Sequence, residues 1–289
     1  MKTLRLIYPQ WQGGIINSFT PELKPEDANL GYILGSQLLQ FLAPENPNQA
    51  TAVVPVSTAN PLDRTVTDGI SNWPEIKEQT EAALKLLDEH NPERIITLGG
   101  ECAVSVAPFA WLKKKYGSKT AIVWIDAHCD LNLPGDTYPG YHAMALAALL
   151  GKCPEQVTSL LPATFTSEQA QVVGLRDWDV GIQARQQEWG VKHVTSKELR
   201  QSPDTINQWL KTIGAEHVVI HFDLDALEPN DLFSAVAAVP HGVTAAEVVG
   251  LINRVDHEFN LVGLTIAEPM PRIAIKLRNM LHGIKLMQD

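Results

Sequence analysis

The segment Val123–Asp130, which reads VWIDAHCD, places three side chains that can bind a metal at the end of a hydrophobic strand pattern. Asp126, His128 and Asp130 occupy alternate positions. Alternate side chains of an extended backbone point to one side, so we expect these groups to face a common space. Two carboxylates held close together are costly unless a cation neutralises them. The segment therefore predicts a buried strand that ends at a metal site.

A second apolar segment ends in the same way. Residues 218–225 read VVIHFDLD, with Asp223 and Asp225 at alternate positions. In an open α/β sheet, ligands bind beyond the carboxyl ends of the strands, where both clusters fall. Each acid alone could cap a helix or a turn, and His128 alone could be a core histidine. Two such clusters, each at the end of a strand rich in Ile and Val, favour a metal site over these structural roles.

Short apolar runs alternate with segments of helical period through most of the chain, a pattern typical of a parallel sheet covered by helices on both faces. The predicted strands are residues 4–8, 52–56, 94–98, 121–126, 170–175, 193–195, 217–223 and 261–266. The predicted helices are residues 74–89, 104–116, 143–150, 205–213, 245–259 and 273–286. We expect a single domain spanning residues 1–289, with three α/β/α layers and a mostly parallel sheet of about eight strands. Residues 44–49 and 57–72 read as surface loops.

The composition excludes several classes of protein. The chain has 289 residues, 45% of them apolar, and a formal net charge of −10, which disfavours binding to nucleic acids and anionic membranes. No apolar run approaches the roughly 18 residues of a membrane helix, and the first residues lack the apolar core of a signal peptide. Cys102, Cys129 and Cys153 lack paired spacing, which indicates reduced thiols. We therefore expect a cytoplasmic protein with neither nucleic acid nor membrane partners.

The motifs DAHCD at residues 126–130 and FDLD at residues 222–225 resemble the two metal motifs of the arginase and agmatinase (ureohydrolase) family. Weaker matches are GG at 99–100, GLRDWD at 174–179 and AEP at 267–269. The resemblance implies an arginase-like fold and a metal-dependent hydrolase that acts on C–N bonds of linear amidines. In that family, a metal-bound hydroxide attacks a guanidinium carbon and urea is released.

The resemblance also implies a pair of Mn²⁺ ions. The implied ligands that match the family are Asp126, His128, Asp130, Asp223 and Asp225. Asp126 and Asp223 would each bridge both ions. One ion would add His128 and Asp225, and the other would add Asp130 and residue 102. Such a pair lowers the pKa of a bridging water and supplies hydroxide near neutral pH.

Residue 102 departs from the family pattern, which has His where this chain has Cys102. A thiolate ligand favours Zn or Fe over Mn, so we expect one or two Mn ions, with Zn or Fe as the alternative metals. A helix start at this position would lower the pKa of the thiol and favour the thiolate. Alternatively, Cys102 is a small buried residue that leaves one metal position empty. A milder departure is Glu228-Pro229, where the family has Asp-Pro.

The predicted catalytic residues are His142, Glu268 and Asp130. The family places a proton-shuttling histidine at the position of His142, and an imidazole that titrates near neutrality suits protonation of a leaving amine. The carboxylate of Glu268 could hold a cationic guanidinium over the metals. The structural alternatives are an exposed loop histidine for His142 and a helix cap for Glu268.

The predicted substrate-binding residues are Asn132, Asp179 and His241. The Thr/Ser/Asn-rich loop with which arginases hold the α-carboxylate has no clear counterpart in residues 131–141, where Asn132 is the closest match. We therefore expect agmatine or another small guanidino, amidino or formimino compound rather than arginine. The family also implies a homo-oligomer. Two other classes stay open, a mononuclear metal amidohydrolase or deacetylase and a non-catalytic metal-binding relative.

Overall fold

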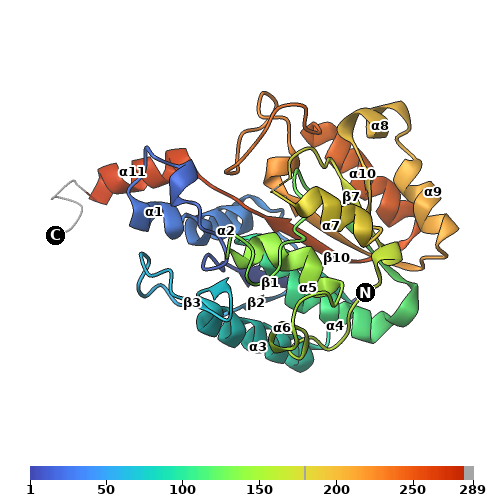
Figure 1. The fold of residues 1–289 in the computed structure, drawn as a ribbon, viewed down its shortest axis with the longest axis horizontal. Helices are drawn as coiled ribbons and strands as arrows, with labels where there is room; N and C mark the ends of the chain where they lie inside the picture. Colours follow the sequence, from blue (N-terminus) through green and yellow to red (C-terminus); the bar gives the residue numbers. More distant parts are fainter. Residues whose placement is uncertain (179, 283–289) are drawn as a thin grey trace.

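The fold is built around one eight-stranded sheet, in a computed structural model that describes residues 1–178 and 180–282 (Figure 1). All neighbouring strands are parallel, in the order β2-β1-β5-β10-β9-β6-β7-β8. The strands are β1 (Thr3–Tyr8), β2 (Ala50–Val53), β5 (Arg94–Gly99), β6 (Thr120–Ile125), β7 (Ala170–Val173), β8 (Lys192–Val194), β9 (His217–Asp223) and β10 (Asn260–Ala267). The predicted parallel sheet of about eight strands is confirmed.

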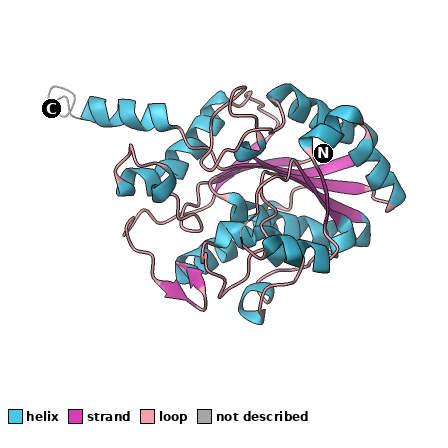
Figure 2. Cartoon of the chain, turned by 45° about the horizontal axis from the view of Figure 1, so that its top comes forward, coloured by secondary structure: helices cyan, strands magenta, loops and turns pink. Residues whose placement is uncertain are grey.

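Helices cover both faces of this sheet and complete the predicted three layers (Figure 2). They are α1 (Pro25–Asn29), α2 (Gly31–Leu42), α3 (Trp73–His90), α4 (Val106–Tyr116), α5 (Ala145–Leu149), α6 (Glu155–Thr158), α7 (Ile182–Glu188), α8 (Ser196–Gln201), α9 (Thr205–Thr212), α10 (Ala245–Glu258) and α11 (Arg272–His282). Strand β6 shows why the sequence pattern is continuous rather than alternating. Ile122 and Trp124 join the core shared with α3 and α4, whereas Ala121, Val123 and Ile125 join the core shared with α9 and α10.

Several helices and strands were not predicted from the sequence. The predicted loop 57–72 contains a short antiparallel hairpin of β3 (Val66–Thr67) and β4 (Ile70–Ser71). Helices α2, α7 and α8 were not predicted, although a capping box of Thr195 and Glu198 marks the start of α8. The predicted helix 104–116 begins too early, because Cys102–Ser105 form a 3-10 helix and α4 begins at Val106. Of the predicted helix 273–286, residues 283–286 lie outside the described residues.

Helix α2 was missed because it contains glycines, which are weak helix formers. A Cβ at Gly35 would lie 2.0 Å from the carbonyl oxygen of Pro269, and a Cβ at Gly31 would lie 2.8 Å from the sulfur of Met270. Glycine at these positions lets α2 pack closely against the segment that follows β10. This contact holds Tyr32 of α2 beside Glu268, where its hydroxyl donates to the carboxylate.

The strand order brings distant parts of the sequence to one edge of the sheet. Strand β9 lies between β10 and β6, with Asp223 paired to Ala267 and Phe222 paired to Ile125. Strand β5 is the other neighbour of β10. Because all these strands are parallel, the segments that follow them emerge at the same edge, which is where the fold predicts a ligand site. Of the helices in residues 1–178 and 180–282, none has the length and apolar character needed to cross a membrane.

Candidate metal centre

A glycine turn after β5 carries Cys102 to the carboxyl edge of the sheet. A Cβ at Gly100 would lie 1.8 Å from the carbonyl oxygen of Gln10, so glycine is required at this close approach. The amide of Cys102 donates to Oε1 of Glu268 at 3.0 Å, and its Sγ lies 2.9 Å from Oδ2 of Asp223. The turn therefore joins three strand ends in one cluster.

A second cluster forms where β6 and β9 end side by side. Nδ1 of His128 lies 2.9 Å from Oδ2 of Asp225 and 3.5 Å from Oδ1 of Asp126. Backbone amides hold the acids in place: His128 donates to Asp126 at 2.7 Å, and Asp225 donates to Asp223 at 2.6 Å. The predicted convergence of the two Asp motifs is thus present in the structure.

His128 and Asp225 form an ion pair in this arrangement. Burial acts to lower the pKa of His128, but Asp225 and the carboxylates of Asp126 and Asp177 outweigh it and raise that pKa well above its usual value. Burial acts to raise the pKa of Asp225, but the neighbouring His128 lowers it overall. A metal ligand must be a neutral imidazole, so metal binding at His128 would release a proton.

The cluster holds more buried carboxylates than cationic partners. Burial, together with the charge of Asp225, raises the pKa of Asp126 to about 7. Burial and neighbouring carboxylates also raise the pKa values of Asp130 and Asp223. Within the described chain, Oδ2 of Asp130 is buried and has no hydrogen-bond partner. A divalent cation would neutralise these oxygens and supply the missing partner, so the donor set fits a metal.

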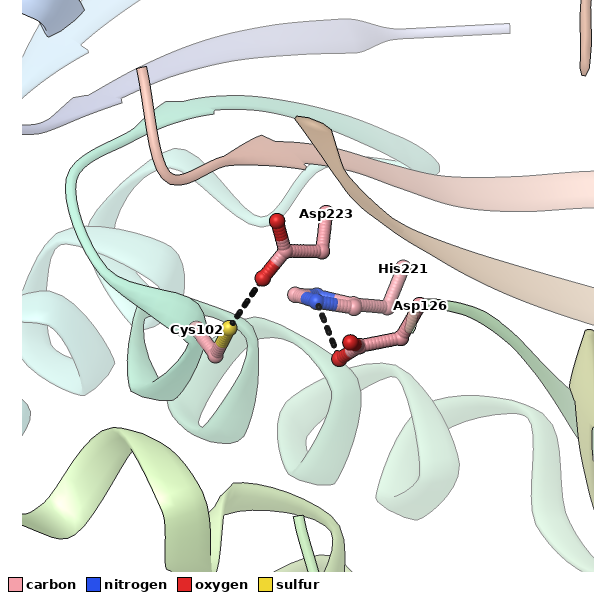
Figure 3. Close-up of side chains that lie close together, drawn as sticks. All are labelled: Cys102, Asp126, His221 and Asp223. Carbon is pink, nitrogen blue, oxygen red and sulfur yellow. Dashed lines mark hydrogen bonds and ion pairs between the residues drawn. The ribbon is translucent and has the colours of Figure 1, made fainter. Parts of the chain in front are cut away.

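His221 is a site residue that the sequence analysis did not single out. It lies on β9 and is fully buried, and Nε2 is 3.9 Å from Oδ2 of Asp126. Figure 3 shows its ring in the same cluster as Cys102, Asp126 and Asp223. The signal was in the sequence, because residue 221 is two positions before Asp223 and so faces the same side of the strand.

His142 lies in a 3-10 helix over Tyr141–Met144, close to Glu268. Its Nδ1 is 3.5 Å from Oε1 of Glu268, and its Nε2 is 2.7 Å from the hydroxyl of Tyr138. Burial acts to lower the pKa of His142, but Tyr138 and Glu268 outweigh it and raise that pKa above its usual value. The pKa of His142 is therefore shifted upward from the expected value near neutrality, which favours the protonated ring.

A cavity of about 120 Å³ opens onto these side chains. Its polar lining includes Cys102, His128, Asp130, Asn132, His142, Asp177, Asp223, Asp225 and Glu268. Its apolar lining includes Ile16, Phe19, Ile182 and Val236. The cavity is small, which limits the ligand to a compact molecule or to the reactive end of a longer one.

The predicted substrate-binding residues have three different outcomes. Asn132 is buried and lines the cavity. Asp179 lies outside the described residues. His241 is exposed and is not among the described residues that line the cavity, because its amide donates to Oε2 of Glu228 at 2.7 Å and holds the loop elsewhere. Asp177 lines the cavity instead, with Oδ2 at 3.6 Å from Nε2 of His128.

The expectation of a low pKa for Cys102 is wrong for the metal-free chain. A 3-10 helix does begin at Cys102, as the sequence suggested. Burial, followed by the charges of Asp223, Asp130 and Glu268, instead raises the pKa of the thiol well above its usual value. In this position the thiol of Cys102 donates to Oδ2 of Asp223.

These features define the class as an α/β protein with a candidate metal centre at the carboxyl edge of a parallel sheet. The model of the arginase family matches residues 36–289, and the chain therefore belongs to the arginase family. The recognition of the ureohydrolase motifs is confirmed.

Known relatives resemble the chain in both sequence and fold. The arginase of Entamoeba histolytica is 26% identical over 238 residues, which cover 75% of this chain and 80% of that protein. A crystal structure of Entamoeba histolytica arginase in complex with L-ornithine has a TM-score of 0.76 at 21% identity, covering 99% of this chain and 98% of that one. Formimidoylglutamase from Bacillus subtilis has a TM-score of 0.70 at 18% identity, covering 99% of this chain and 88% of that one.

Proposed function

We propose that this arginase-family protein is a metal-dependent hydrolase that cleaves an amidino C–N bond of a small guanidino or formimino compound. The observation that carries the proposal is the convergence of the two Asp motifs at one edge of the sheet, where His128, Asp130, Asp223 and Asp225 line the cavity and Asp126 lies buried beside His128. His142 and Glu268 stand at that same cavity. The names of the relatives, arginase and formimidoylglutamase, support an amidino group as the reactive group.

The side chains that would hold the metals are the carboxylates and imidazoles at the ends of β6 and β9. They are Asp126, His128, Asp130, Asp223 and Asp225, with Cys102 as the further candidate. Bound divalent cations neutralise the buried acids and make water a nucleophile near neutral pH. We propose Mn as the metal held by the side chains at the ends of β6 and β9, because most of these ligands are carboxylates. Zn or Fe are the alternatives near Cys102.

The remaining groups have roles that follow from their charge and contacts. Glu268, held by the hydroxyl of Tyr32 and the amide of Cys102, would pair with a cationic guanidinium. His142 would donate a proton to the leaving amine, since its neighbours raise its pKa. Asp130 contributes a buried carboxylate oxygen beside the reacting centre. In the reaction, water adds across the C–N bond, its oxygen stays on the amidino carbon, and the amine leaves with a proton.

The residues that line the cavity indicate which kind of substrate tail it can hold. Among the described lining residues there is no Lys or Arg, and Asn132 is the predicted donor for a carboxylate. Apolar groups of Ile16, Phe19 and Val236 line the cavity as well. These groups suit an aliphatic tail that lacks a carboxylate better than an α-amino acid. Agmatine or another guanidino or formimino compound therefore remains the proposed substrate class, ahead of arginine.

We further propose a cytoplasmic, single-domain protein that forms a homo-oligomer. Eight of the ten strands between residues 3 and 267 belong to one sheet, which supports one domain. The three cysteines are free and buried, as suits a reducing compartment. Helix α11, at the end of the described chain in Figure 1, exposes Ile273, Leu277 and Met280, which a neighbouring subunit could cover.

The test combines metal analysis with product release from a panel that includes agmatine, arginine, formimino compounds and N-acetylated amines. We expect metal-dependent release of urea or formamide, lost in Asp126→Asn. Asp88→Asn is the matched control, since Asp126 and Asp88 each accept a tryptophan indole N–H at 2.8 Å and Asp88 lies outside the site. Acetate release with one bound metal would instead favour a mononuclear deacetylase. Absence of both metal and turnover would reject the proposal.

A further inference from the structure

We propose that Cys102 and His221 act together with Asp126 and Asp223 as a metal site of mixed sulfur, nitrogen and oxygen donors that selects zinc over manganese. This inference rests on the proposed metal-dependent function and deepens it by naming the ion at one of the metal positions. The site departs from the ligand set implied by the family resemblance, because it adds an imidazole from the middle of β9.

The four donor atoms already stand close enough to share one ion. One atom from each of Cys102, Asp126, His221 and Asp223 lies within 4.8 Å of every other. Sγ of Cys102 is 2.9 Å from Asp223, and Nε2 of His221 is 3.9 Å from Asp126, as the dashed lines in Figure 3 mark. With zinc bonds of about 2.0–2.3 Å, donors around one tetrahedral ion stand roughly 3–4 Å apart. The cluster therefore needs small adjustments rather than a rearrangement.

The decisive observation is an unpartnered nitrogen of His221. The side chain has no exposed surface, and Nε2 has no hydrogen-bond partner among the described residues. Leaving a buried polar atom without a partner destabilises the folded protein. Because this atom faces the carboxylate of Asp126, a cation between them would satisfy both groups.

The surroundings of His221 hold its ring in a fixed orientation. Nδ1 is 2.8 Å from the hydroxyl of Ser105, and the ring stacks on Trp124 with centroids 3.6 Å apart and planes 13° apart. The same Trp124 donates its indole N–H to Oδ2 of Asp126 at 2.8 Å. A metal-binding imidazole is commonly oriented by a partner on its other nitrogen, and Ser105 provides one here.

A competing group of Cys102, His142 and Glu268 also brings its donors within 4.8 Å of one another. The latter two residues are already engaged, however. His142 pairs with the hydroxyl of Tyr138, and Glu268 accepts from the hydroxyl of Tyr32. The unsatisfied nitrogen of His221 therefore favours the site on the β6–β9 side of Cys102.

The donor chemistry determines which metal the site prefers. Thiolate and imidazole ligands suit zinc, whereas a set rich in carboxylates suits manganese. The neighbouring cluster of Asp126, His128 and Asp225 has two acids and one imidazole, without sulfur. Since the two clusters share Asp126, the geometry assigns adjacent metal positions of different preference, with zinc at Cys102 and His221.

The test uses His221→Asn in the full chain, a change that removes Nε2 but keeps a polar atom for Ser105. The matched control is His217→Asn on the same strand, since His217 also has a partnered Nδ1, with Asn260 at 2.9 Å, and stacks on a ring, that of Tyr116. Zinc affinity is measured in competition with a chelator, and circular dichroism checks folding. We expect His221→Asn to weaken zinc binding by at least about tenfold, with no change in His217→Asn.

Two measurements on the unmodified chain keep the proposal testable if His221→Asn fails to fold. X-ray absorption of the protein loaded with one zinc should report one sulfur ligand at about 2.3 Å together with imidazole scattering. Cobalt substitution should give a thiolate-to-metal charge-transfer band that disappears in Cys102→Ser. Zinc bound without sulfur, or with unchanged affinity in a folded His221→Asn, would overturn the inference and leave the proposed hydrolase intact. A protein that binds no metal would overturn both.

Discussion

The two halves of the candidate metal centre differ in how their polar atoms are satisfied. In one half, His128 is paired with Asp225 and the acids accept backbone amides, so these groups form a connected hydrogen-bond network. In the other half, a neutral Cys102 thiol contacts Asp223 and one nitrogen of His221 has no partner among the described residues. The first half follows the family motif and the second departs from it. The contrast teaches that two clusters sharing Asp126 offer different donors, one of carboxylates and an imidazole and the other with a thiol as well.

The largest expected effect is the loss of an acid that serves both halves. Asp126→Ala or Asp223→Ala should remove bound metal and lower kcat by at least about 10³-fold, because Asp126 belongs to both clusters and the family resemblance implies that Asp223 also bridges both ions. Metal analysis and product release would be measured on the same preparations. Normal metal content and rate in Asp223→Asn would show that the site has been assigned wrongly.

A smaller effect should separate proton transfer from metal binding. His142→Ala should keep its metal and lower kcat by about 10²-fold, since a positioned general acid contributes on that scale. The comparison is with Asp126→Asn, which loses metal as well as rate. Loss of metal in a folded His142→Ala would mean that this residue is a ligand rather than a proton donor.

Substitution at Cys102 should shift metal preference more than rate. Cys102→His should raise the preference for Mn over Zn by about tenfold, because an imidazole is less selective for zinc than a thiolate. Cys102→Ala should lower the metal content by one ion if the thiol is a ligand. Retention of two tightly held Mn ions in both the unmodified chain and Cys102→Ala would contradict both readings of this residue.

The smallest effect concerns stability without metal. Burial raises the pKa values of Asp126 and Glu101 to about 7, so the folded chain keeps protons that the unfolded chain releases above pH 4–5. The free energy of unfolding of the metal-free protein should therefore fall as pH rises from about 4.5 to 7. Metal at 100 times its Kd should add about 2.7 kcal/mol, or roughly 5–10 °C in Tm. Calorimetry with and without chelator checks this, and a Tm that rises with pH in the chelated protein would contradict it.

The sequence predicted the sheet well because its strands are buried on both faces. Runs such as residues 217–223 match the observed strand β9 at both ends, since continuous burial leaves a continuous apolar pattern. Helix α2 was not predicted, because Gly31 and Gly35 are weak helix formers. Both glycines allow close packing against the segment after β10. Contacts between distant segments, such as that of Tyr32 with Glu268, leave no local pattern at all.

The site residues also divide into those with a local sequence pattern and those that depend on contacts between distant segments. Asp126, His128, Asp223 and Asp225 could be predicted because strand alternation fixes where they point. His221 follows the same alternation. A single histidine in an apolar strand is nevertheless predicted to be a core residue until its neighbours in the fold are known. The raised pKa of Cys102 could not be predicted from the helix start, because it comes first from burial and then from carboxylates that follow other strands. The direction in which a strand residue points follows from its own strand. The pKa of that residue depends on the charged groups that several strands bring to the same edge of the sheet.

The most direct test of the proposed function is a titration of the metal-free protein with Mn²⁺ and Zn²⁺, with hydrolysis of a guanidino or formimino compound measured at each ratio of metal to chain. We predict no turnover at zero metal and a rise to a plateau at one or two ions per chain. Turnover that is unchanged by complete metal removal would contradict the account.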